Sequence, residues 1–153
     1  MNLSQYDTTH NASKGAFLHL CSPTGQLLYH IEKDDEGNEI AKHPIGVTCL
    51  GADSKEFLKC QHKLQDHRTD NVRVKRGGKI EGLSAEQTEE DALAQLSFAI
   101  TEFHYIAWSD FPNSPVQMRE ATKENKLTFL EKFRWARDQV DEFVYDRTNF
   151  LGE

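Results

Sequence analysis

The residues best suited to bind a metal in this sequence are Cys60, His62 and His67, which lie within eight residues of one another. Thiolate sulfur and imidazole nitrogen are the usual ligands of Zn²⁺, which takes four ligands in a structural site. The segment has helical periodicity, and on a helix Cys60 and His62 point to different faces. No fourth ligand stands at a typical spacing. The sequence therefore predicts no metal centre.

Motifs for nucleophilic catalysis and for phosphate or dinucleotide binding are missing from the sequence. Gly77-Gly78-Lys79 lacks the preceding strand and the spacing of a phosphate-binding loop. Adjacent carboxylates such as Asp34-Asp35 and Asp141-Glu142 project from different sides of a helix or strand, so they do not form an acid–base pair. We therefore expect no enzymatic activity and no cofactor.

An aromatic stripe near the C-terminus is the strongest pattern in the chain. Phe129, Phe133, Ala136, Val140 and Phe143 follow one another at steps of four, three, four and three, which places them on one face of a helix or of two helical segments in line. Such a stripe is usually the core-facing side of a helix. Aromatic side chains also supply much of the energy at protein interfaces, so a docking surface is the alternative.

The end of the chain resembles a known family. Trp-Ala-Arg-Asp-Gln-Val-Asp-Glu-Phe at 135–143, followed by Asp-Arg-Thr-Asn-Phe-Leu at 146–151, resembles the closing motif of tail assembly chaperones from long-tailed bacteriophages. The resemblance extends back over residues 45–151, with a strand, a turn into a helix, a basic linker and a Ser-led helix in the same order. Residues 1–44 contain no matching motif.

This resemblance implies a function. Tail assembly chaperones bind the tape measure protein, whose long apolar helices would otherwise aggregate, and help to bring tail tube subunits to it. They work in the host cell cytoplasm and are absent from the finished virion. The family often has a short form and a longer frameshifted form, and this chain would correspond to the short one. Self-association along the client is a further expectation.

The same reasoning assigns the binding surface. We expect the aromatic and apolar side chains of the stripe and its flanks to contact a partner, and two arginines to hold the register through carboxylate pairs. The predicted protein-binding residues are Phe129, Phe133, Trp135, Arg137, Val140, Phe143, Arg147 and Phe150. Two alternatives stay open: a structural subunit of the virion, such as a head–tail connector or tail terminator, and a small binding module that uses the basic segment 68–79.

Composition narrows the choice of partners. The 153 residues carry a formal net charge of −7, which disfavours nucleic acid and anionic membranes. No apolar run approaches the roughly 20 residues that span a bilayer, and the N-terminus lacks the pattern of a signal peptide. Three cysteines, Cys21, Cys49 and Cys60, make a disulfide framework improbable.

The periodicity predicts an α+β fold, with a small N-terminal antiparallel β-sheet followed by a helix-rich C-terminal part. Residues 1–13 are expected to form a flexible arm, and residues 14–151 a single domain that is β-rich over 14–51 and mainly helical over 52–151. The expected strands are 16–22, 26–31 and 45–50, with a turn at Pro23-Thr24-Gly25 and a solvated acidic loop over 32–38. The expected helices are 53–67, 84–106 and 122–147.

Overall fold

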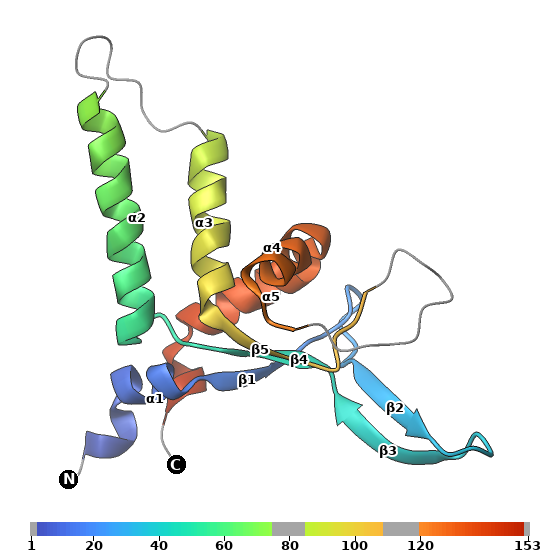
Figure 1. Ribbon diagram of the computed structural model, residues 1–153. Coiled ribbons are helices and arrows are strands. Elements are labelled where there is room, and N and C mark those ends of the chain that lie inside the picture. Colours follow the sequence, from blue (N-terminus) through green and yellow to red (C-terminus); the bar gives the residue numbers. More distant parts are fainter. Residues whose placement is uncertain (1–2, 75–84, 109–119, 152–153) are drawn as a thin grey trace.

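The computed structural model describes residues 3–74, 85–108 and 120–151. The fold is α+β, as the sequence predicts, and its sheets are antiparallel. β1 (Ala16–His19), β4 (Gly46–Cys49) and β5 (Ile100–His104) form a three-stranded sheet with β4 in the centre. β2 (Tyr29–Lys33) and β3 (Glu39–Pro44) form a separate hairpin that projects from one corner of the molecule (Figure 1).

The first predicted hairpin is only partly correct. The turn at Pro23-Thr24-Gly25 is present, because the Gly25 amide donates to the Ser22 carbonyl oxygen at 2.8 Å and Gly25 has a φ of +87°. However, β2 forms its strand pairing with β3, and the segments that follow β1 and precede β2 are joined by the isolated Cys21–Leu27 bridge. The sequence pattern did not predict β3, and the acidic stretch 32–38 contains the end of β2 and the tip of the β2–β3 hairpin.

The helices differ from prediction mainly at their ends. α2 (Lys55–Val74) continues seven residues beyond His67 into the predicted basic linker, and residues 75–79 of that linker lie outside the described residues. α3 (Ala85–Ala99) stops where a helix was expected to run on to Ile106, because Ile100 and the residues after it pair with β4. Ile100 and Phe103 would be buried in a helix as well as in a strand, so their spacing alone does not distinguish these two structures.

The predicted helix over 122–147 is interrupted. α4 (Lys123–Lys132) and α5 (Arg134–Tyr145) are separated at Phe133, whose φ of −114° and ψ of 75° are not helical. Thr122 caps α4 by accepting a hydrogen bond from the Asn125 amide. The two helices therefore share one buried stripe without forming one continuous rod.

Most of the N-terminal segment that the sequence predicts as an arm is helical. Its residues form a short 3-10 helix, η1 (Leu3–Tyr6), and then α1 (Thr8–Lys14), which buries Ala12 completely. The Gly51 amide donates to the Ala12 carbonyl oxygen, and a β-carbon on Gly51 would lie 2.7 Å from the Ala12 side chain. This close approach fixes α1 to the start of the segment that leads into α2.

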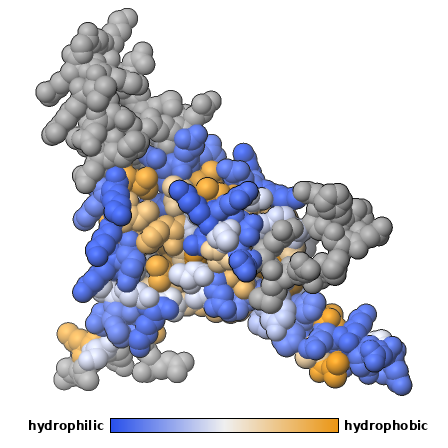
Figure 2. All heavy atoms as spheres, in the orientation of Figure 1, coloured by the Kyte–Doolittle hydropathy of each residue, from blue (hydrophilic) through white to orange (hydrophobic). Residues whose placement is uncertain are grey.

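One hydrophobic core lies between the three-stranded sheet and α3, α4 and α5. Its largest buried side chains include Phe57, Leu20, Ile100, Phe129 and Leu130. Trp108 packs at the edge of this core against Phe103, Phe129 and Phe133. Outside the core, polar residues dominate the face shown in Figure 2, and apolar side chains reappear on the projecting hairpin.

A candidate protein-binding groove beside α5

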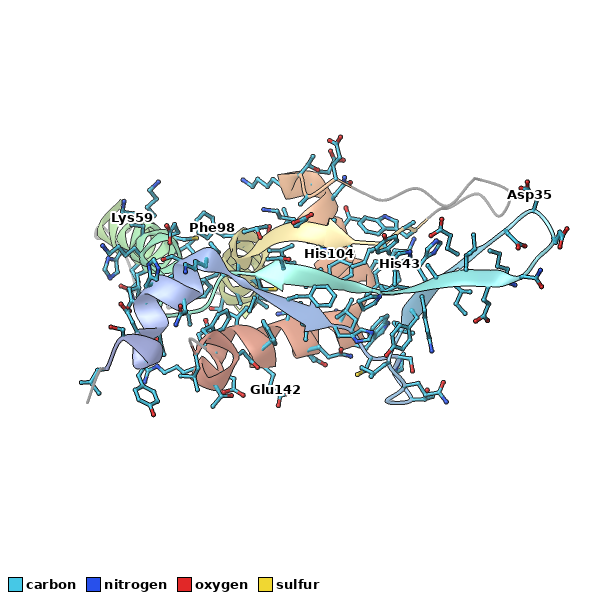
Figure 3. The ribbon with its side chains drawn as sticks, turned by 90° about the horizontal axis from the view of Figure 1, so that it is seen from below. Asp35, His43, Lys59, Phe98, His104 and Glu142 are labelled. Carbon is cyan, nitrogen blue, oxygen red and sulfur yellow. The ribbon has the colours of Figure 1, made fainter. Side chains whose placement is uncertain are left out.

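Two parallel rows of side chains run along the exposed part of α5 and its C-terminal cap. Trp135, Gln139 and Phe143 recur at steps of four, which aligns them on one side of the helix. We call these three residues the groove row. Asp138, Glu142 and Asp146 also recur at steps of four, and all three are exposed. We call them the acidic row. Figure 3 shows Glu142 at the outer side of α5.

Both rows border a groove of about 530 Å³. Its other wall is formed by the end of β1 and the turn that follows it. The lining residues on that wall are Leu18, His19, Cys21, Ser22, Pro23 and Gly25. Leu18, Trp135 and Phe143 are partly buried and pack on the core, so they form an apolar floor fixed from below. The groove therefore combines a rigid apolar floor with a rim of three carboxylates.

Gln139 holds the two walls together. The Cys21 amide donates to Gln139 Oε1 at 2.8 Å, and Gln139 Nε2 donates to the Cys21 carbonyl oxygen at 2.8 Å. The side chain thereby satisfies both backbone groups of Cys21, as a neighbouring strand would. The glutamine in the closing motif therefore has a structural role that the sequence pattern alone does not reveal.

Gln139→Ala should lower the free energy of unfolding by about 1–3 kcal/mol, because it leaves two part-buried backbone groups without their partner. Denaturant unfolding measures this loss, and amide hydrogen exchange should become faster at Cys21. Gln26→Ala is the control, since that glutamine is exposed. Equal stability of the two variants would contradict the assigned role.

The closing motif forms a compact structure, which we call the C-terminal clasp: Asp146, Arg147, Asn149 and Phe150. These residues lie in or next to the short helix η2 (Arg147–Phe150). Arg147 donates to both carboxylate oxygens of Asp53, at 2.8 and 3.2 Å. Asn149 donates to the Phe143 carbonyl oxygen, and the Asp146 carboxylate accepts from the Thr148 amide. Phe150 is buried. The clasp thus fixes the end of α5 to the start of α2.

The Asp53–Arg147 contact makes stability depend on pH. Hydrogen bonds from Arg147 lower the pKa of Asp53 below its usual 3.8, and Thr8 contributes in the same direction. A carboxyl group whose pKa is lower in the folded state stabilises the fold at pH values above its ordinary pKa. This contribution is lost as the pH falls through the lower, folded-state pKa.

Asp53→Asn should therefore cost about 1 kcal/mol at neutral pH, and the difference from the unsubstituted protein should shrink below the ordinary aspartate pKa of 3.8. Urea titrations at neutral and acidic pH measure this difference. Arg147→Gln should show the same pH profile, and the double variant should lose less than the sum of the two. A pH-independent difference would argue against the ion pair.

The structure separates the predicted binding residues into two groups. Phe129, Val140 and Phe150 have at most 3% of their surface exposed, so their assignment to a binding surface is wrong and they belong to the core. Arg137 pairs with Glu89 at 3.0 Å and Arg147 pairs with Asp53, so both arginines form ion pairs within the chain. Phe133 is partly buried among other aromatic rings. Only Trp135 and Phe143 line the groove.

Sequence reasoning missed Asp138, Gln139 and Glu142 as site residues, although their spacing was visible. Two carboxylates four residues apart lie on one helix face, but only the position of the β1 end shows which face borders a groove. Leu18 and Cys21, more than a hundred positions away in the chain, could not be linked to α5 by any local pattern.

The described part of the chain has few features that would indicate a metal site, a nucleophilic cysteine or a membrane span. Residues 3–74, 85–108 and 120–151 contain no group of three or more His, Cys, Asp or Glu side chains that could hold a metal ion. Burial raises the pKa of the Cys49 thiol to about 12, so it stays protonated and is a poor nucleophile. Within the same ranges, no helix has the length and apolar character required to cross a bilayer.

Comparison with known proteins gives no independent assignment. No protein-family model matches the chain, and no match was found among curated proteins or among solved structures. The closing motif and the geometry of the groove are therefore the features that bear on function.

Proposed function

We propose that this protein is a tail assembly chaperone of a long-tailed bacteriophage. Its client would be the tape measure protein, to which it would help to recruit tail tube subunits during tail morphogenesis in the host cell cytoplasm. The observation that carries this proposal is the closing motif of residues 135–151, because its helix borders the groove and its last residues form the clasp.

The residues of the motif have different structural roles, and this supports the proposal. Val140 and Phe150 pack in the core, Gln139 and Arg147 tie α5 to distant segments, and Trp135 is left on the groove floor. A motif whose buried positions hold two partly buried aromatic side chains, Trp135 and Phe143, at the floor of a groove fits a protein that recognises others. The client enters along α5, in contact with the groove row.

The chemistry of the groove fits an amphipathic helical client. Apolar side chains at helical spacing would cover the floor formed by Leu18, Trp135 and Phe143. The acidic row would favour lysine or arginine at the flank of the same client helix and disfavour acidic segments. The groove thereby covers apolar helix surface that would otherwise aggregate.

Co-expression with the tape measure protein tests this function. We expect a soluble complex that co-elutes in size-exclusion chromatography, formed from a client that is insoluble by itself. A client that stays insoluble beside a folded, soluble chaperone would contradict the proposal. Mass spectrometry of purified particles tests the alternative of a virion structural subunit, which would be present at the copy number of a ring, whereas a chaperone would be absent.

A further inference from the structure

The β2–β3 hairpin has a surface that nothing in the described part of the chain covers. Ile40 is 63% exposed and Ile31 is 40% exposed, although both are large apolar residues. Strand edges in natural proteins are normally protected by charges, and exposed isoleucines weaken that protection. Figure 2 shows apolar atoms on the projecting hairpin, away from the main body of the molecule.

The same hairpin is strongly acidic. Its segment from Glu32 to Lys42 has five carboxylates and two lysines. The carboxylates are Glu32, Asp34, Asp35, Glu36 and Glu39, and all five are exposed. The hairpin therefore offers a partner both apolar area and negative charge.

The base of the hairpin is held by stacked rings. Tyr105, just after β5, stacks on His43 with ring centres 4.5 Å apart and on His30 at 5.3 Å. His43 Nε2 also lies 3.1 Å from a carboxylate oxygen of Glu32. Because these contacts fix the direction of the hairpin, docking it onto a partner costs less conformational entropy than docking a free loop.

The opposite end of the molecule has the complementary surface. Lys55, Lys59 and Lys63 recur at steps of four on α2, so they form one exposed basic stripe. Leu58 on the same exposed side of α2 is 40% exposed, and Phe98 at the end of α3 is 41% exposed. Figure 3 shows Lys59 and Phe98 at one end of the molecule and Asp35 at the other.

We propose that the β2–β3 hairpin of one copy docks on the α2 stripe and the neighbouring apolar side chains of a second copy. The two surfaces lie at opposite ends of one chain, so they meet only between molecules. Because the two patches differ, one such contact leaves a free hairpin and a free α2 stripe on the pair, and these either meet across a two-fold axis or bind further copies. In the second case the contacts propagate into rings or open chains. The groove beside α5 is not part of this contact.

Charge-reversal variants of the purified chain test this self-association without any client. One variant carries Asp35→Lys, Glu36→Lys and Glu39→Lys on the hairpin. The other carries Lys55→Glu, Lys59→Glu and Lys63→Glu on α2. All six side chains are exposed, and circular dichroism with thermal unfolding verifies that each variant is folded. A chain with all six changes has both charges exchanged and serves as the matched control.

Light scattering and sedimentation velocity over a concentration series give the readout. The unsubstituted chain should rise from its 17.5 kDa single-chain mass to at least about twice that mass, because a single contact already joins two copies. Each triple variant alone should remain a monomer. The six-fold variant, and an equimolar mixture of the two triple variants, should regain assembly, and added salt should weaken it.

Ile40→Ser separates specific docking from general charge attraction. It changes no charge, and because Ile40 is exposed it should leave the fold intact while lowering the assembled fraction. The proposal is overturned if the unsubstituted chain stays monomeric at every concentration, if either triple variant assembles as before, or if the exchanged charges fail to restore assembly.

Discussion

Replacing Phe129 by alanine should lower the free energy of unfolding by about 3–5 kcal/mol, the usual cost of removing a fully buried phenylalanine. Phe129 is 2% exposed and lies edge-on to the Phe103 ring, with the ring centres 5.3 Å apart. It also packs against Trp108 and Phe133. The substitution removes contacts with three other aromatic side chains, and in a close-packed core the surrounding side chains have little freedom to fill the cavity.

Denaturant unfolding with a constant m-value measures this loss. Phe98→Ala is the control, because Phe98 is 41% exposed and its loss should cost less than about 1 kcal/mol. Equal costs for the two substitutions would contradict the placement of Phe129 in the core. If Phe129→Ala instead left stability unchanged and weakened client binding, that result would support the prediction that this residue belongs to a binding surface.

Reversing two charges of the acidic row should weaken client binding by about tenfold or more. Asp138→Lys with Glu142→Lys replaces attractions of about 0.5–1 kcal/mol each by repulsions of similar size, and 1.4 kcal/mol corresponds to tenfold in affinity. Both side chains are exposed and line the groove, so the fold should be unaffected. The measurement is the fraction of tape measure protein that co-elutes with the variant.

The matched control for this prediction changes net charge by the same amount elsewhere. Glu90 on α3 and Glu131 on α4 are exposed and do not line the groove. Glu90→Lys with Glu131→Lys should therefore retain the client. Equal losses for the two pairs would show that binding follows overall charge and not the groove.

The sequence predicted the fold class because amphipathic periodicity is a local property. The stripe from Phe129 to Phe143 is buried much as the spacing indicates, with the break at Phe133 as the exception. No side-chain hydrogen bond caps the start of α5, so the sequence contains no capping signal for this break. Phe133 packs among Phe129, Trp135 and Trp108, and periodicity does not reveal its contact with Trp108, which lies in an earlier segment of the chain.

The errors arose where long-range pairing decided the local structure. Ile100 and Phe103 fit a helical stripe by spacing, but their backbone pairs with β4, about fifty residues earlier in the chain. The sequence pattern did not reveal the β2–β3 hairpin because its strands carry charged residues. Glu32 and Lys33 are ordinary surface residues on an exposed strand.

The site was predictable only in part for the same reason. Phe143 of the predicted stripe lines the groove, whereas Phe129 and Val140 of the same stripe are buried. A helical stripe does not reveal which of its members a second element covers. Here Val140 lies within the core, whereas Trp135 lines the groove beside the turn after β1.

Photo-crosslinking from the groove rim tests directly whether the client binds beside α5. A benzophenone side chain at Glu142, in a chain co-expressed with the tape measure protein, should crosslink to the client on irradiation. The same group at Glu131, which is exposed on α4 and lies outside the groove, should give little crosslink. A strong crosslink from Glu142 alone is the result that the groove model predicts. Equal yields from both positions, or a client crosslink from Glu131 alone, would contradict it.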